Sequence, residues 1–372
     1  MKTIVSLIGS ALAAMGASAA VAQSNVTVFG IMDVFVGRVT GAPGVRSGEQ
    51  AISSLNGGGL STSTIGFRGR EDLGDGAYAA FELSSFTRPD TGQSGRSEAV
   101  GPPVNVAADP FWSRSAWVGL GHTRYGSLRL GNGPTLMWIN ALTTNALGAT
   151  TNFSPIALVM FVGGPLSGGT SWTNQVVLDS AEFGGFSFGL AAAAAEGQGR
   201  RNLGAQVSYR QGAWALGLAW QDVKKNPLTF ADGTSLIQTG SWLLSGSYDM
   251  KWARLFANAG AICDHGTPTT PANRNYKIWS VSSAVPIGLG RVLLGVASRS
   301  TDDVVGPAPA TVPGGNISRR VATVGYDYYL SKRTDVYLLA RSDQTVTRTL
   351  PAPPRNIDAS STSFALGVRH TF

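Results

Sequence analysis

The chain has 372 residues, with 29 Lys and Arg against 22 Asp and Glu, which gives a formal net charge of +7. No Lys- or Arg-rich run accompanies this mild positive balance, so the composition does not indicate a nucleic-acid-binding protein. The single cysteine, Cys263, excludes an intramolecular disulfide and any cysteine-based metal site. Glycine accounts for 48 residues, roughly twice its usual share of about 7%, which favours many strands and tight turns.

Residues 1–22 have the pattern of a cleaved secretory signal peptide. Lys2 gives a positively charged start, residues 4–15 form a short apolar run, and residues 20–22 read Ala-Val-Ala. The alternative, a transmembrane anchor, is disfavoured because the apolar run is too short and too rich in Gly, Ser and Ala. We therefore expect residues 23–372 to form the exported domain.

Period-two alternation of apolar and small or polar side chains recurs from Asn25 to the end of the chain. In the segment 214–220, for example, Trp214, Leu216, Leu218 and Trp220 share one face of a strand. We expect sixteen strands, near residues 25–38, 60–70, 76–88, 111–121, 125–132, 172–182, 185–195, 201–211, 213–224, 235–248, 252–264, 274–286, 290–302, 316–330, 334–348 and 357–372.

Short and long connections alternate after the first strand. Residues 211–213 and 249–251 are short turns, whereas residues 89–110 and 304–315 are long and rich in Gly, Pro, Ser and Thr. This alternation is typical of an up-and-down membrane barrel with an even number of strands, whereas soluble sandwiches mix connection lengths. A closed sheet also leaves no unpaired backbone edge in lipid. The sequence thus predicts an all-β fold, a 16-stranded antiparallel transmembrane β-barrel, and a secreted β-sandwich binding module is the weaker alternative.

One long segment, residues 130–178, contains no Asp, Glu, Lys, Arg, His, Tyr or Cys. Irregular segments of this length in a compact domain are usually functional. We expect residues 133–171 to fold into the lumen as the third loop and to narrow the channel. Trp138, Phe153 and Phe161 are candidates for lining the narrowest passage. The alternative is that they, and particularly the run 156–160, pack against the inner wall.

Strand parity predicts which charged side chains face the lumen. Arg114, for example, is assigned to the lumen because we expect Trp117 to face lipid. The predicted pore-lining charges are Arg68, Glu82, Arg114, Arg129, Arg299, Asp327, Arg341 and Asp343. The alternative for any one of them is an ordinary solvated position. The basic excess predicts a modest anion preference, because fixed charge in a confined pore concentrates the opposite ion.

Enzymatic interpretations find little support. The H-E-x-x-H, G-x-S-x-G and P-loop motifs are absent from the sequence. A barrel hydrolase would need His265 near a nucleophilic Ser and an acid, but the adjacent Asp264 points to the opposite face of a strand. We therefore expect no catalytic residues, no bound metal and no cofactor, and an outer-membrane hydrolase remains a remote alternative.

The chain resembles the trimeric general porins of Gram-negative outer membranes, particularly those of β-proteobacteria. The matching segments follow the family's order along residues 23–372: VTVFGIMD at 26–33, IGFRG at 65–69, EDLG at 71–74, RSAWVGL at 114–120, FGGFSFG at 183–189, VGYDY at 324–328, LSKRT at 330–334 and FALGVRH at 364–370.

The resemblance implies a cell outer-membrane porin that forms a water-filled channel for passive diffusion of small hydrophilic solutes and ions. It further implies a homotrimer surrounded by outer-membrane lipids and lipopolysaccharide, with no nucleic-acid partner. The terminal Phe372 resembles the family's signal to the barrel-assembly machinery. A substrate-specific outer-membrane channel for one small solute is the alternative function.

The chain departs from the family at its usual constriction. Three positions where these porins commonly carry Arg are here Thr64, Asn132 and Trp172, and the third loop supplies no acidic side chain. The transverse field that the resemblance implies should therefore be weak. We expect low ion conductance and easier passage of small uncharged or aromatic solutes.

Overall fold

The computed structural model describes residues 25–40, 52–95, 110–148, 150–161, 169–197, 200–224, 228–229, 235–267, 274–301, 316–349 and 355–372. The expected signal peptide, residues 1–22, lies outside these ranges. The described residues form nineteen strands, of which β2 (Ile52–Gly57), β5 (Gln93–Ser94) and β12 (Leu228–Thr229) are short additions. The other sixteen are β1 (Asn25–Val39), β3 (Thr64–Gly74), β4 (Ala77–Arg88), β6 (Ser115–His122), β7 (Gly126–Pro134), β8 (Ser171–Ser180), β9 (Phe186–Ala193), β10 (Asn202–Gln211), β11 (Trp214–Val223), β13 (Ser235–Asp249), β14 (Arg254–Gly266), β15 (Arg274–Ile287), β16 (Gly290–Ser300), β17 (Asn316–Tyr329), β18 (Thr334–Thr349) and β19 (Arg355–Thr371).

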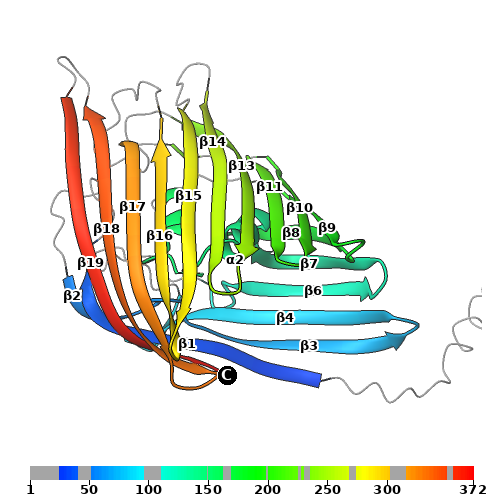
Figure 1. Ribbon diagram of the computed structural model, residues 1–372. Coiled ribbons are helices and arrows are strands. Elements are labelled where there is room, and N and C mark those ends of the chain that lie inside the picture. The colour runs from blue at the N-terminus through cyan, green and yellow to red at the C-terminus, as the bar shows by residue number, and fades with distance from the viewer. Residues whose placement is uncertain are drawn as a thin grey trace, which may run out of the picture.

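These sixteen strands form a closed antiparallel barrel (Figure 1). Each main strand pairs with the next along the chain, and β1 closes the ring because Ile31 pairs with Thr371 of β19 and with Thr64 of β3. The predicted fold class and strand count are therefore confirmed. The additional strand β2, which pairs with the second half of β1, was not predicted.

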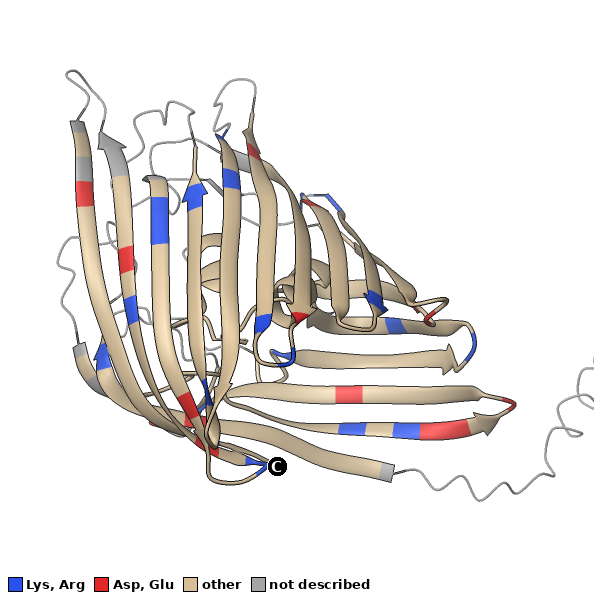
Figure 2. Ribbon diagram, viewed as in Figure 1, with Lys and Arg blue, Asp and Glu red and all other residues tan. Residues whose placement is uncertain are grey.

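The two faces of each strand differ as the alternation requires. On β11, Trp214, Leu216, Leu218 and Trp220 are exposed on the outer face, while Ala219 on the inner face is fully buried. The Trp214 ring lies 4.4 Å from that of Tyr248 on β13, as in an aromatic girdle at a membrane interface. Figure 2 shows that charged residues occupy few positions along the strands. No helix among the described residues is long and apolar enough to cross a bilayer.

The segment between β7 and β8 carries two short helices, α2 (Leu136–Thr143) and α3 (Pro155–Met160). The Thr135 hydroxyl caps α2 by accepting a hydrogen bond from the Trp138 N–H at 3.1 Å. Pro155 begins α3 at a position where a missing N–H has no cost. Helix α2 contacts β9, β10, β11 and β13, and α3 contacts β15, β16 and β17. The two helices therefore pack beside one half of the barrel wall.

Candidate functional site

Helix α3 is attached to the wall by apolar packing. All six of its residues are buried, and Ile156, Val159 and Met160 belong to a cluster with Ile278 and Val321 of the wall. Of the two interpretations of the run 156–160, the structure shows packing against the wall. The buried apolar area holds the helix in place without any charged side chain from the loop.

Three arginines of adjacent strands fasten the backbone of this segment. The Arg299 Nη1 donates to the Val159 carbonyl at 2.9 Å, and the Arg319 Nη1 donates to the Leu158 carbonyl at 2.6 Å. The Arg341 Nη1 donates to the carbonyl of Asn152. Each of the three arginines is only 2% exposed. Their charge is thus directed at loop carbonyls and not at open water.

Arg319 also forms a buried ion pair with Asp343. Its Nε and Nη2 donate to the two carboxylate oxygens at 3.1 Å and 2.7 Å. Asp343 was predicted as a pore-lining charge, but it is fully buried in this pair. Arg319 was missed by sequence reasoning, although it shares the parity of Asp327 on the same strand and could have been found in that way.

Helix α2 is attached by neutral hydrogen bonds. The Asn140 side-chain amide donates to the Leu243 carbonyl at 3.1 Å and to the Ser245 hydroxyl at 2.9 Å. The Asn258 amide donates to the Thr144 carbonyl at 2.9 Å. The loop is therefore positioned on this side of the barrel by neutral hydrogen bonds, without an acidic side chain of its own.

The aromatic residues of the loop differ in their exposure. Phe153 has no exposed surface and packs edge-to-face with Phe35 of β1, their ring centroids 6.0 Å apart. Phe161 is also buried, and its ring lies 4.9 Å from that of Trp138, which is partly exposed. Of the two alternatives for Phe153 and Phe161, lining the passage or packing against the inner wall, their burial supports packing. Trp138 is the one of the three that keeps part of its surface exposed.

The exposed surface of α2 is uncharged. Besides Trp138, it consists of Ile139 and Leu142, which are half-buried, and Thr143, which is exposed. Sequence reasoning did not single out Ile139 or Leu142. The helical spacing relative to the buried Leu136, Met137, Asn140 and Ala141 is the signal that would have found them.

The strands β4 to β8 carry two ion pairs on their inner face. Arg114 lies 3.1 Å from Glu82, and Arg129 lies 2.6 Å from Asp179. The expectation that Trp117 faces lipid is wrong, because the Arg129 guanidinium lies over its ring at 5.4 Å and Val118 and Leu120 occupy the outer face. Arg114 precedes the first residue of β6, so its contact with Glu82, and not strand parity, directs its side chain.

The three positions that commonly carry Arg in the resembled family have structural contacts here. Thr64 is buried, and the Asn132 amide donates to the carbonyls of Trp112 and Ser113 at 3.2 Å and 3.3 Å. Trp172 is buried in a cluster with Leu136 and other apolar residues. None of these three side chains supplies a charge to the lumen.

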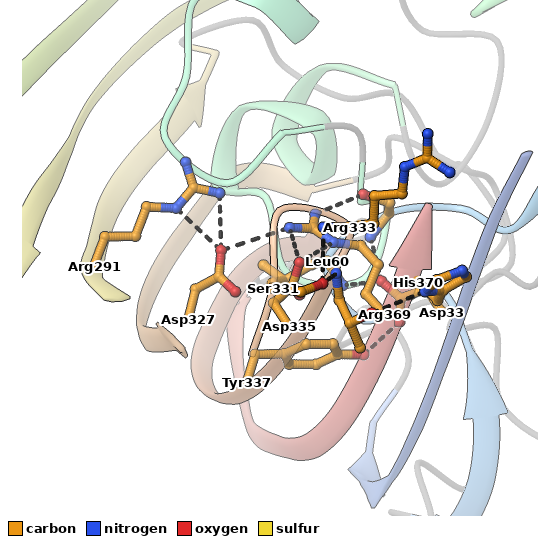
Figure 3. Close-up of polar contacts among 12 residues, drawn as sticks. Asp33, Leu60, Arg291, Asp327, Ser331, Arg333, Asp335, Tyr337, Arg369 and His370 are labelled. Atoms are coloured by element: carbon orange, nitrogen blue, oxygen red, sulfur yellow. Dashed lines mark hydrogen bonds and ion pairs between the residues drawn. The ribbon is translucent and has the colours of Figure 1, made fainter. Parts of the chain in front are cut away.

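A second charged network lies at the short-turn ends of β16, β17, β18 and β19 (Figure 3). The Arg291 Nε and Nη2 donate to one oxygen of Asp327 at 3.0 Å and 2.9 Å. Arg369 donates in the same manner to Asp335 at 3.1 Å and 2.9 Å, and its Nη2 lies 3.6 Å from Asp327. Asp327, predicted to line the pore, is fully buried within this network.

Asp33 on β1 holds the segment before β3 in place from the same region. Its carboxylate accepts hydrogen bonds from the backbone N–H groups of Gly59, Leu60 and Ser61, at 3.0 Å, 2.9 Å and 2.7 Å, and from the Tyr337 hydroxyl (Figure 3). Four donors satisfy this buried acid without a cation.

The remaining predicted residues are Arg68 and Phe372. Arg68 pairs in register with Glu82, and its guanidinium lies 5.1 Å from the Phe29 ring. Phe372 exchanges two backbone hydrogen bonds with Gly30, each 3.1 Å long, and so extends the seam between β19 and β1. Among the described residues there is no cluster of three His, Cys, Asp or Glu that could hold a metal ion.

The chain is similar in sequence to known outer-membrane porins. Residues 9–347 match the family model described as Gram-negative porin. The outer membrane porin protein 32 of Delftia acidovorans is 29% identical, with 97% of this chain and 98% of the relative covered. An outer membrane porin protein of Bordetella pertussis is 24% identical, with 98% of this chain and 99% of the relative covered.

Solved structures share the fold. An anion-selective porin from Comamonas acidovorans superposes with a TM-score of 0.74 at 23% identity, covering 94% of this chain and all of that one. A trimer form of OmpT from Vibrio cholerae gives a TM-score of 0.62 at 12% identity, covering 94% and 99%.

Proposed function

The chain belongs to the Gram-negative porin family, and from this premise we propose that its channel has a modest preference for small anions. Like the relatives, it is an outer-membrane channel for passive diffusion and not an enzyme. The preference rests on which lumen charges remain after the described ion pairs and loop contacts have formed.

Most of the described lumen arginines are engaged by a carboxylate or by loop carbonyls. The exceptions include Arg68, Arg70, Arg210 and Arg254, for which no ion pair is present among the described residues. The buried acids Asp33 and Asp264 accept hydrogen bonds and are almost wholly shielded from water. An unpaired guanidinium in a confined, water-filled lumen concentrates anions. The printed name of the Comamonas relative, an anion-selective porin, supports the same sign.

We expect the preference to be modest because the field across the channel is weak. The described parts of the loop segment 133–171 offer only uncharged side chains, so arginines on the wall face no acid across the passage. We propose that this segment narrows the channel, with Trp138, Ile139 and Leu142 of α2 at its exposed surface. A weak transverse field leaves discrimination between ions to the few unpaired arginines.

We also propose that the chain assembles as a homotrimer in the outer membrane. The trimer form of the Vibrio cholerae relative supports this assembly. The exposed leucines and valines of the outer face would contact membrane lipid and, in the outer leaflet, lipopolysaccharide. Phe372 would serve the barrel-assembly machinery as the family's terminal signal.

The anion preference is tested by the zero-current potential across a planar bilayer in a KCl gradient. Wild type should give a potential of the sign set by chloride, and the double variant Arg210→Gln/Arg254→Gln should shift it toward zero. A potential of cation sign in wild type would overturn the proposal. Conductance steps in groups of three would support the trimer.

The second candidate is a channel specific for one class of solute. A cavity beside the loop, lined in part by Arg254 and Arg291, favours it. Swelling of liposomes in sugars, amino acids and aromatic acids of similar size separates the two functions. Rates that follow solute size alone support general diffusion.

A further inference from the structure

We propose that a cavity on the short-turn side of the loop binds small carboxylates that carry an apolar body, such as a single aromatic ring. The cavity has a volume of about 220 Å³ and lies between residues 143–148 and the wall. Its arginines Arg254 and Arg291 lie at the beginnings of β14 and β16, next to the short turns that precede these strands. Short turns of such barrels face the periplasm. The inference deepens the anion preference proposed above.

The cationic side of the cavity retains unused hydrogen-bond donors. Arg291 gives its Nε and Nη2 to Asp327, which leaves Nη1 available (Figure 3). Arg254 donates only from Nη2, to the Ser247 hydroxyl at 3.2 Å, and has no ion pair among the described residues. A planar guanidinium with free donors is suited to bind a carboxylate.

The third arginine of the lining, Arg369, is fixed as part of the wall. Its Nε and Nη2 donate to Asp335 and its Nη1 donates to the Ser61 hydroxyl at 3.0 Å. The acids that contact Arg291 and Arg369, Asp327 and Asp335, are therefore already engaged. Asp249, which pairs in register with Arg254, accepts a hydrogen bond from the Lys251 N–H at 2.8 Å and forms no ion pair with Arg254. A ligand anion would meet Arg254 and Arg291 without displacing an ion pair.

The other side of the cavity is apolar. Leu60, Leu147 and Phe256, all buried, line it together with Ala284. A sugar would leave this surface without apolar contact and the arginines without a counter-charge. A small inorganic anion would use only the cationic half. A carboxylate with an apolar body satisfies both halves, since burial of its ring adds to the charged hydrogen bonds.

The walls of the cavity are held in place before any ligand enters. Asp33 accepts a hydrogen bond from the backbone N–H of Leu60 at 2.9 Å, and the Ser282 hydroxyl accepts one from the Ala146 N–H at 3.1 Å. The Asn145 amide donates to the Gly148 carbonyl at 3.2 Å. Little ordering is therefore required on binding, which favours affinity.

Residues of this cavity also line a second one. A larger cavity of about 440 Å³ shares Thr143 and Arg254 with it and adds Arg210. A solute would pass along Arg210 and Arg254 as it crosses the channel. A weak site of this kind concentrates its solute and still releases it.

The test is block of the ion current of the full-length protein in planar bilayers. Benzoate is compared with benzamide, which has the ring without the charge, and with acetate, which has the charge without the ring. Benzoate should reduce the current at concentrations about tenfold lower than acetate, because the ring is buried, and benzamide should have no effect in that range. Equal potency of benzoate and acetate would overturn the inference.

Two variants complete the test. Arg254→Gln should weaken the block by benzoate about tenfold, since a charge-assisted hydrogen bond is lost. Arg68→Gln removes the same charge from β3, away from the cavity. It should change the concentration of benzoate that blocks half of the current by less than about twofold. Equal shifts in both variants would mean a general effect of charge and would contradict the site.

The outcome is independent of the ion preference. Benzoate block that depends on Arg254 supports the site even where the zero-current potential shows no preference for chloride. A chloride preference without benzoate block leaves the proposed function intact and refutes the site. Retention of the SDS-resistant folded band confirms that each variant has assembled.

Discussion

The guanidinium of Arg299 on β16 donates a 2.9 Å hydrogen bond to the backbone carbonyl of Val159 in the loop helix α3. Both residues are buried. A charge that strand parity places on the lumen side thus serves to attach the loop. The same holds for Arg319 and Arg341 on the two following strands.

Loss of Arg319 should destabilise the barrel strongly. Arg319→Met leaves the fully buried carboxylate of Asp343 without its cation and should lower the free energy of unfolding by about 3–5 kcal/mol. Arg319→Met/Asp343→Leu removes both charges and should recover much of that loss. The measurement is the temperature at which the SDS-resistant folded band disappears. Equal temperatures for the single and double variants would show that the ion pair does not matter.

An acid placed on α2 should create the transverse field that the loop lacks. Leu142→Glu introduces a carboxylate on the exposed face of the helix, and Leu142→Gln is the uncharged control of similar size. We expect the glutamate to move the zero-current potential toward the cation sign, since a fixed negative charge at a narrow passage attracts cations. An unchanged potential would mean that α2 does not border the conducting path.

Gly59 should not tolerate a side chain. A Cβ atom at this position would overlap the Tyr337 hydroxyl, which donates to Asp33. Gly59→Ala should lower the free energy of unfolding by about 1–3 kcal/mol, the usual cost of overpacking. Gly92→Ala is the comparison. A Cβ added there would meet open space, but φ is +73°, so this variant measures backbone strain without overlap. The same thermal assay applies, and the account predicts the larger loss at Gly59.

The strands could be predicted from the sequence because alternation and turn lengths are local properties. All sixteen main strands lie where the period-two pattern indicates, as the segment Trp214–Val223 illustrates. The inner or outer face of a strand also followed from its aliphatic residues. The error at Trp117 arose because one large aromatic was weighed above Ala116, Val118 and Leu120, which share the outer face.

The roles of the charged residues could not be predicted, because they depend on contacts distant in the sequence. Parity assigns Arg299 and Arg341 to the inner face. It does not show that they bind the carbonyls of Val159 and Asn152, which lie 140 and 189 residues earlier in the chain. The network of Arg291, Asp327, Arg369 and Asp335 joins three neighbouring strand pairs for the same reason. Only the folded barrel brings these groups together.

The central claim is that buried wall arginines hold the loop, while the unpaired lumen arginines, Arg210 and Arg254 among them, set the ion preference. Single-channel recording of Arg299→Gln/Arg341→Gln beside Arg210→Gln/Arg254→Gln tests it most directly, because each pair removes the same charge. The account predicts that the first pair increases open-channel noise and leaves the zero-current potential close to wild type, and that the second pair shifts the potential toward zero. A first pair that shifts the potential as far as the second, with unchanged noise, would contradict the account.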